Sequence, residues 1–591
     1  MSDKDSHHLL LRVPTPVATA LSCCEATPRG MKHWLHGLPR ANLGEMARQL
    51  YQALIQLNQL RTPSENRLQL LELLRPEVQM VCHLLERNFL HRPLVLDERP
   101  RKVASLCQAL QHHLAIGYKL VVVRLASPAG QDRQPLLAIA LQRALSSLRG
   151  LVVRASQLYC PVPEGVWLDL HRLHAIGRER NLQRTPVRDE LVHHTASSSI
   201  EQAYLAALLL GGARCNQIRQ QQIAGLAEVL EAWSALTSLT AAGSRDGLFV
   251  VLPQADGPPR YRAQIPAAEA AGGIGLETGR LVEAIERRLA GETDTRSGLV
   301  IPDGMNDDLL RHLATAWGST AERSFQRKAG GGTLDVCVGM SAVHFFLAGE
   351  RVFDKVIAQP QAGSPARFSL QGGEPDVWAR AFDAQSGSAA LSLAGDSIEF
   401  RPARAEEEAE TSFPVHPLGV VNHSPGGYCL AWPGETPAQL QAGELLGLRD
   451  SVGWQVAVVR WLRLVRGAGT QMGVELLGPS AEPCGIRLVR KQEQGSQYLR
   501  GLLLPPIAAI SRPATVIAPR LPFQEGHKVL LAREGQEHRA VLSRRIAGTG
   551  SYSEFEYRSL EVKPQPETFV TAGKTGPAGP DEDFDSLWKS L

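Results

Sequence analysis

The sequence predicts a multidomain α + β protein: an N-terminal all-α helical region, either a bundle or repeat-like, followed by a β-barrel and a further small β unit. Three observations lead to this prediction. The chain has 591 residues, which is too long for a single core. Apolar residues recur at helical spacing through the first half, whereas strand-like runs dominate from residue 333 onward. Its 43% hydrophobic and 21% charged residues are ordinary for a globular protein.

Helical patterns fill a predicted domain over 41–245, which follows a flexible N-terminus over 1–40. The clearest helix start is Thr62-Pro63-Ser64-Glu65, because Thr62 can cap, Pro63 suits the first helical position and Glu65 can reach back to the cap. Further helices are expected near 43–60, 100–123, 133–158, 164–180, 197–211 and 215–240. The chain shows no clean 34-residue repeat signature, so bundle and repeat array both remain open.

A mixed α/β connector is predicted over 246–318, from a strand-like run at Gly247–Pro253 and helical runs at 276–290 and 304–317. A glycine-rich stretch, Gly273–Gly279, is expected to open the first of these helices. Strands are then expected at Thr333–Val338, Ala342–Leu347, Leu418–Val421, Tyr428–Trp432, Gln455–Val465 and Met472–Leu477.

Two low-complexity segments and one additional β unit complete the domain plan. The segment 359–412 is rich in Gln, Gly, Ala, Ser and Pro, and is expected to be a flexible insertion. Alternating runs predict the additional β unit over 481–562. A disordered acidic tail is expected over 563–591. In this tail, Phe584, Trp588 and Leu591 would share one helical face, which suits docking into a partner, but a purely solubilising tail fits equally well.

Charge and cysteine usage exclude several classes of protein. The net charge is only +3, so nucleic-acid binding is not expected. No run approaches the roughly 18 apolar residues that span a bilayer, and no secretion signal opens the chain, so neither membrane insertion nor export is expected. The nine cysteines include no Cys-x-x-Cys pair, which disfavours a disulfide framework or a zinc site. We therefore expect a cytoplasmic protein without metal or redox cofactor.

Two polar motifs lie beside predicted strands. Arg323 and Arg327 are four residues apart and precede Thr333–Val338, and the turn Asn422–Gly427 lies between two apolar runs. Arginine binds oxyanions bidentately and stacks on bases, so such a pair suits a ligand carrying phosphates and purines. Asn422 and Ser424 can hydrogen-bond a base edge or a phosphate. Glycines at 426 and 427 allow the backbone to turn and approach the ligand without a Cβ.

Both motifs together resemble the PilZ domain, a small β-barrel that binds cyclic di-GMP. In that family the arginine pair precedes the first barrel strand, the polar turn joins two later strands, and a Gly-hydrophobic-polar-hydrophobic run, here Gly473–Leu477, forms the last strand. The resemblance implies a PilZ-like barrel over 319–480, interrupted by 359–412. It implies a cyclic di-GMP site made by Arg323, Arg327, Asn422, Ser424, Gly426 and Gly427.

The sequence departs from the family pattern at two points. The arginines and the polar turn are unusually far apart, and Asn422 replaces the commoner aspartate. A nearer pair, Arg401 and Arg404, has the wrong spacing, adjoins an acidic run and leads into no strand, so we reject it. Ser424 is not a hydrolase nucleophile, because Asn422 stands where that elbow needs glycine. We find no catalytic set and expect a protein that is not an enzyme.

The resemblance implies a cyclic di-GMP effector whose helical N-terminal region binds a protein partner. By resemblance, the outputs of such effectors include motility, type IV pili and surface attachment. The layout of a long helical front and a late barrel also looks like the FimW-type long PilZ proteins. The alternative is a helical scaffold with a degenerate, non-binding barrel. The sequence favours the effector, because a decayed site need not retain both arginines and the whole turn.

Overall fold

The computed structural model describes residues 11–127, 133–192, 194–242, 247–292, 298–319, 326–358, 413–465, 467, 469–478, 480–489, 497–506 and 512–560. The insertion 359–412 and the tail with Phe584, Trp588 and Leu591 lie outside the described residues. The chain divides into two compact units. One contains Met1–Gln326 with Trp432–Ala442 and Trp461–Gln471, and the other contains the remainder.

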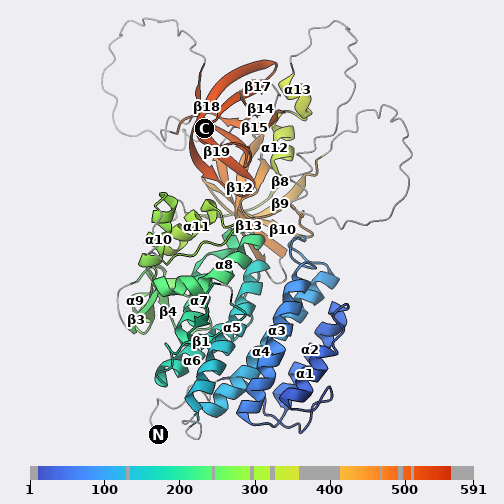
Figure 1. The fold of residues 1–591 in the computed structure, drawn as a ribbon. Coiled ribbons are helices and arrows are strands. Elements are labelled where there is room, and N and C mark those ends of the chain that lie inside the picture. Colours follow the sequence, from blue (N-terminus) through green and yellow to red (C-terminus); the bar gives the residue numbers. More distant parts are fainter. Residues whose placement is uncertain are drawn as a thin grey trace, which may run out of the picture. The chain divides into compact units, whose positions relative to one another are not determined.

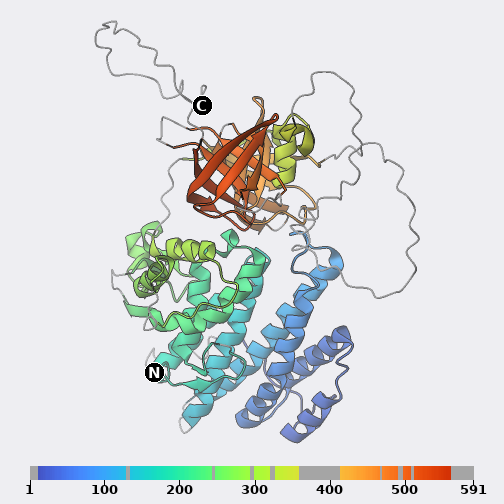
Figure 2. The same ribbon diagram turned by 45° about the horizontal axis from the view of Figure 1, so that its top comes forward.

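The first unit is mainly helical, as predicted. Its helices are α1 (Pro28–His36), α2 (Leu43–Gln59), α3 (Ser64–Glu86), α4 (Glu98–Leu125), α5 (Gln134–Gln157), α6 (Val166–Glu179), α7 (Ile200–Gly212), α8 (Gln220–Trp233), α9 (Ala267–Ala270), α10 (Gly279–Leu289) and α11 (Asp307–Gly318). Helix α4 packs between α3 and α5, and the three lie side by side in Figures 1 and 2. Their apolar faces form a continuous core between the helices.

Helix α5 is the most apolar of the long helices in this unit. Among the described residues it is the one helix long and apolar enough to cross a membrane by length and composition. However, 67% of its most apolar 18-residue window is buried inside the protein. It packs against α4, α6, α7 and α8. The apolar surface of α5 is thus covered by neighbouring helices, as in the core helix of a helical domain.

Helix α1 corrects the prediction of a flexible N-terminus over 1–40. Thr27 caps this helix by accepting a hydrogen bond from the Gly30 amide at 3.1 Å, and Pro28 occupies the first turn. Met31 and Leu35 are buried. The sequence contained the signal, because a threonine followed by proline is a common helix start.

The predicted cap at Thr62 does not form, since α3 begins at Ser64 without a side-chain cap. A capping box instead opens α7. The Ser199 hydroxyl accepts from the Gln202 amide at 3.2 Å, and the Gln202 side chain accepts from the Ser199 amide at 2.9 Å. This pair satisfies two backbone donors that the helix itself cannot pair.

Replacing Ser199 by alanine should lower the stability of the helical unit by about 1 kcal/mol, because one of those donors loses its acceptor. Thermal unfolding followed by circular dichroism measures the effect. Ser197→Ala is the matched control, since Ser197 is exposed and precedes the helix. Equal melting temperatures for the two variants would contradict the assigned role of the box.

Strands β1 (Val187–Arg188) and β2 (Ser197–Ser198) form a small antiparallel pair within this unit. A four-stranded sheet follows, in the order β3-β6-β4-β5, from β3 (Ser238–Ala242), β4 (Phe249–Val251), β5 (Arg260–Tyr261) and β6 (Ile274–Glu277). The mixed α/β character predicted here is present. However, most of the glycine-rich stretch Gly273–Gly279 forms a strand, β6, instead of a helix start. Helix α10 begins only at the last residue of this stretch, Gly279.

The first barrel contains β7 (Lys328–Ala329), β8 (Thr333–Val338), β9 (His416–Ser424), β10 (Gly427–Trp432), β11 (Leu445–Arg449), β12 (Trp454–Val465) and β13 (Gly469–Gly478). The strand order is β10-β13-β12-β11-β8-β9-β7, and an additional pairing of β10 with β9 closes six strands into a ring. Strand β7 pairs with β9 beyond the end of β8.

Two short helices follow β8, namely α12 (Met340–Leu347) and α13 (Phe353–Ile357). Helix α12 corrects the predicted strand Ala342–Leu347. Gly339, with a φ of +92°, ends the strand conformation, and Ala342, Val343 and His344 are then buried in succession. A strand covered on one face buries alternate residues, so three consecutive buried residues do not fit that pattern. They fit a helix that packs against several strands, here β8, β11, β14 and β15. Tertiary packing here overrides the β propensity of valine and phenylalanine.

A second barrel, coloured orange to red in Figures 1 and 2, follows the first in the sequence. It is closed in the order β14-β15-β16-β19-β18-β17. Its strands are β14 (Glu482–Leu488), β15 (Leu499–Leu504), β16 (Thr515–Pro519), β17 (Lys528–Arg533), β18 (Gln536–Gly548) and β19 (Tyr552–Ser559). One hydrophobic cluster contains residues of both barrels, including Val456, Leu477, Leu502 and Tyr552. The predicted fold class, helices followed by a barrel and a further β unit, is confirmed.

Candidate nucleotide-binding site

Arg327 and Asn422 meet at the start of the first barrel. The Arg327 guanidinium donates a hydrogen bond from Nη1 to Asn422 Oδ1 at 2.8 Å. The backbone supports this contact, because Lys328 pairs with His423 and Ala329 pairs with Asn422 in the antiparallel ladder of β7 and β9. Residues that the sequence separates by 95 positions are therefore adjacent in space. The structure joins Arg327 to the polar turn, with the insertion 359–412 between them in sequence.

Gly330 allows the chain that follows Arg327 to approach the backbone of β9 closely. A Cβ at this position would approach the Val420 carbonyl oxygen to 2.6 Å, closer than side chains approach backbone. The Gly330 amide donates to the Val421 carbonyl at 3.0 Å, and the Val420 amide donates to the Gly332 carbonyl at 3.1 Å. Strand β7 was not predicted. The signal that could have found it is the run Gly330–Gly332, which permits so close a backbone approach.

The polar turn is the tip of the β9–β10 hairpin. Asn422 and Ser424 belong to strand β9, where they pair with Cys429 and Gly427, so only Pro425 and Gly426 form the turn itself. Side chains two residues apart on a strand face the same side, which puts Asn422 and Ser424 on one surface. The Ser424 hydroxyl lies 3.4 Å from the Gly427 carbonyl oxygen, to which it donates.

Gly427 is needed for packing against strand β13. Its φ is +153°, and a Cβ there would lie 2.0 Å from the Val474 carbonyl oxygen. The adjacent Gly426 carbonyl accepts a hydrogen bond from the Leu476 amide at 3.1 Å. The sequence suggested that this glycine admits a ligand. In the structure, the close neighbour of Gly427 is the backbone of the strand that the family pattern marks as the last of the barrel.

An aromatic pair occupies the other side of the same hairpin. His423 and Tyr428 are register partners, and their ring centroids are 6.5 Å apart. Burial raises the pKa of Tyr428, and the carboxylate of Asp450 adds to the shift. The phenol therefore stays protonated at neutral pH. Paired residues of an antiparallel ladder face one side, so these rings lie on the face opposite to Asn422.

Of the six predicted site residues, the structure places five. Arg327 and Asn422 are hydrogen-bonded, and Ser424 lies on the same face of β9 as Asn422. Gly426 lies in the hairpin turn, and Gly427 is the first residue of β10. Arg323 lies outside the described residues. Arginine has five N–H groups, so Arg327 can keep its bond to Asn422 and still present donors to a phosphate or to the O6 and N7 acceptors of guanine.

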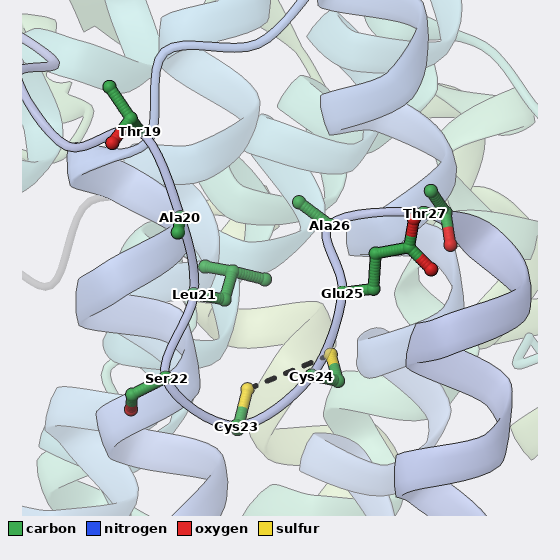
Figure 3. Close-up of a pocket in the computed structure, with 9 residues that line it drawn as sticks. All are labelled: Thr19, Ala20, Leu21, Ser22, Cys23, Cys24, Glu25, Ala26 and Thr27. Carbon is green, nitrogen blue, oxygen red and sulfur yellow. Dashed lines mark hydrogen bonds between the residues drawn. The ribbon is translucent and has the colours of Figure 1, made fainter.

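A hollow of about 530 Å³, formed by Thr19–Thr27, contains none of these residues. Figure 3 shows the thiols of Cys23 and Cys24 at its rim, with their sulfur atoms 3.8 Å apart. Burial and the neighbouring Cys23 thiol raise the pKa of Cys24 to about 12, so Cys24 is a neutral thiol at physiological pH. Within the described ranges, no group of three or more His, Cys, Asp or Glu side chains is arranged to hold a metal ion.

Comparison with known families agrees with this geometry. The barrel and the segment before it, residues 248–483, match the family model of the middle PilZ domain of the cyclic-di-GMP receptor FimW. Residues 29–244 match its N-terminal domain and 484–560 its C-terminal β-barrel domain. The fold and the site thus define a PilZ-domain protein.

The relative named cyclic-di-GMP receptor FimW, from Pseudomonas aeruginosa, is 55% identical over 608 aligned positions, covering 100% of both chains. This chain belongs to the FimW family. No solved structure matches it. The resemblance inferred from the two polar motifs is therefore confirmed at the level of the family and of its domain order.

Proposed function

We propose that this protein is a cyclic di-GMP receptor that responds to the second messenger without catalysing a reaction. The observation that carries the proposal is the bond between Arg327 and Asn422, which links one arginine of the predicted pair to the polar turn. Membership of a family whose relative is named a cyclic-di-GMP receptor supports it. The ligand would contact Arg323, Arg327, Asn422 and Ser424, with Gly426 and Gly427 shaping the hairpin beneath it.

The proposed site includes backbone that is paired within the barrel. Residues 328–330 are already hydrogen-bonded to β9, so Arg327 stands at a fixed position on the barrel. In this mechanism Arg323, four residues earlier in the sequence, supplies a second guanidinium to the ligand. Pre-organisation of Arg327 lowers the ordering cost of ligand binding.

Calorimetric titration of the full-length protein with cyclic di-GMP tests the proposal. Wild type should give saturable heat, and ligand at 100 times Kd should stabilise the protein by about 2.7 kcal/mol, seen as a rise in melting temperature. Arg323→Ala should weaken binding by about tenfold or more, because a charge-assisted contact to phosphate is lost. Cyclic di-AMP should not compete, since adenine offers a donor where guanine offers O6.

The chain contains a spacing-matched control. Arg184 and Arg188 are also four residues apart, and their side chains are 87% and 84% exposed in pairs with Glu201 and Glu190. The double variant Arg184→Ala with Arg188→Ala should bind like wild type. Absence of both heat and thermal shift in the wild type would support the alternative of a scaffold with a non-binding barrel.

The helical region is the proposed partner-binding element, and the cytoplasm is the proposed location. Motility, type IV pili and surface attachment are the proposed outputs, by analogy with other cyclic di-GMP effectors. A pull-down with the full chain, with and without cyclic di-GMP, tests partner binding. We expect the recovery of a partner by wild type to depend on cyclic di-GMP. Recovery by Arg323→Ala should not depend on it. Ligand-independent recovery would contradict coupling between the messenger and the partner.

A further inference from the structure

Strand β13 connects the β9–β10 hairpin to the second barrel over only a few residues. On one side, the Leu476 amide donates to the Gly426 carbonyl and Val474 lies against Gly427. On the other side, the Leu477 carbonyl accepts a hydrogen bond from Arg512 Nη1 at 2.6 Å. Arg512 lies three residues before Thr515, where β16 of the second barrel begins. Two neighbouring residues of one strand, Leu476 and Leu477, therefore contact the hairpin and the second barrel.

The contact from Arg512 is held by a buried carboxylate. Arg512 Nη2 donates to Glu554 Oε1 at 2.6 Å, and the Thr515 hydroxyl donates to the same oxygen at 2.7 Å. The side chain of Glu554 is 2% exposed, whereas that of Arg512 is 26% exposed. A charge-assisted bond to a buried carboxylate fixes the guanidinium more firmly than a surface ion pair would. Arg512 thus joins β19 of the second barrel to β13 of the first.

Apolar packing reinforces this connection. The Leu477 side chain is buried in the cluster that includes Leu502, Ile517 and Tyr552 of the second barrel. Two residues earlier in β13, Glu475 pairs with Arg460 of β12. Burial opposes the charge of Arg460, but its bond to the Glu475 carboxylate raises the pKa of Arg460 overall. Side chains of β13 therefore contact both β12 and the second barrel.

We infer that the C-terminal barrel is a working part of the nucleotide site, and that Arg512 is a positioning residue that holds the β9–β10 hairpin in its binding geometry through β13. This inference rests on the proposed function. The hairpin carries Asn422 and Ser424, and its tip is fixed by β13. Loss of the Arg512 contact frees the Leu477 carbonyl, and the adjacent Leu476 amide can then shift away from Gly426. The cost falls on ligand affinity, since the hairpin must be reordered when the ligand binds.

Titration of the full-length protein with cyclic di-GMP measures the effect. Arg512→Ala leaves the buried Glu554 carboxylate unpaired and can unfold the barrel. The informative variant is therefore Arg512→Met combined with Glu554→Gln, which removes the bond to Leu477 and the buried charge together. We expect its Kd to rise about tenfold, which corresponds to roughly 1.4 kcal/mol of binding free energy. Arg539→Ala is the matched control, because Arg539 is an exposed arginine of the same barrel.

Hydrogen exchange separates positioning from general destabilisation. In the double variant the Leu476 amide should exchange faster than in the Arg539→Ala control, and saturating cyclic di-GMP should restore its protection. Unchanged affinity and unchanged exchange at Leu476, in a variant that remains folded, would overturn the inference while leaving the proposed function intact. Failure of the wild type to bind cyclic di-GMP would instead remove the proposed function itself.

Discussion

Replacing Arg327 by alanine should weaken cyclic di-GMP binding by about 10- to 100-fold while leaving the fold intact. The loss follows from removing one charge-assisted donor set, for which about 1.5–3 kcal/mol is typical. Arg327 is exposed, and its one described side-chain bond, to Asn422, lies at the surface, so the stability of the barrel should change little. Calorimetric titration gives the affinity, and thermal unfolding without ligand checks the fold.

Two further variants sharpen this prediction. Arg327→Lys should recover only part of the affinity, because an ammonium group cannot bind bidentately or stack on guanine. Asn422→Ala, alone and combined with Arg327→Ala, completes a double-mutant cycle. Since the two side chains are 2.8 Å apart, their losses should differ from additivity by more than about 0.5 kcal/mol. Strictly additive losses would mean that the two side chains bind the ligand independently.

Replacing Gly427 by alanine should destabilise the β-rich unit by about 2–4 kcal/mol and abolish binding at ligand concentrations that saturate the wild type. The new Cβ would lie 2.0 Å from the Val474 carbonyl oxygen, so either β10 or β13 must move. Backbone displacement and the φ of +153° both add to the cost of overpacking. Differential scanning calorimetry, with the transition of this unit identified by its shift with ligand, measures the loss.

Gly419→Ala is the matched control for this substitution. Gly419 belongs to the same hairpin, on strand β9, and no atom lies within 4 Å of the position that its Cβ would occupy. We expect a change in stability within about 0.5 kcal/mol for this variant. Similar losses for the two variants would show that glycine is required for strand flexibility rather than for the contact with Val474.

Elements with a regular period were predicted well from the sequence. Helix α2 was expected at 43–60 and runs over Leu43–Gln59, because its apolar positions recur at helical spacing. Strand β7 escaped prediction, since two residues carry no period and its pairing with β9 depends on a distant segment. Helix α12 was assigned as a strand because its residues favour strands locally, while its burial is decided by two barrels.

Part of the candidate site was predicted from the sequence, but its detailed geometry was not. The residue types at 327 and 422 indicated an anion- and guanine-binding pair, and the structure places them in contact. The role of Gly427 in packing was not predictable, because the sequence does not show that Val474 lies opposite. Arg512 was also missed. Its partner Leu477 belongs to another barrel, and the pairing order of the second barrel does not follow the order of its strands in the chain.

The closure of both strand rings restricts how a protein partner can bind the β-rich unit. A closed ring leaves no free sheet edge. Within the described residues, few unpaired backbone donors and acceptors of these barrels are therefore free to bind a peptide as an added strand. The exception is β7, whose outer side is only two residues long and begins with Lys328, a residue that discourages edge pairing. Recognition of this unit must therefore rely on side chains. A partner whose binding depends on the ligand would contact the side chains around Arg327 rather than add a strand to a sheet.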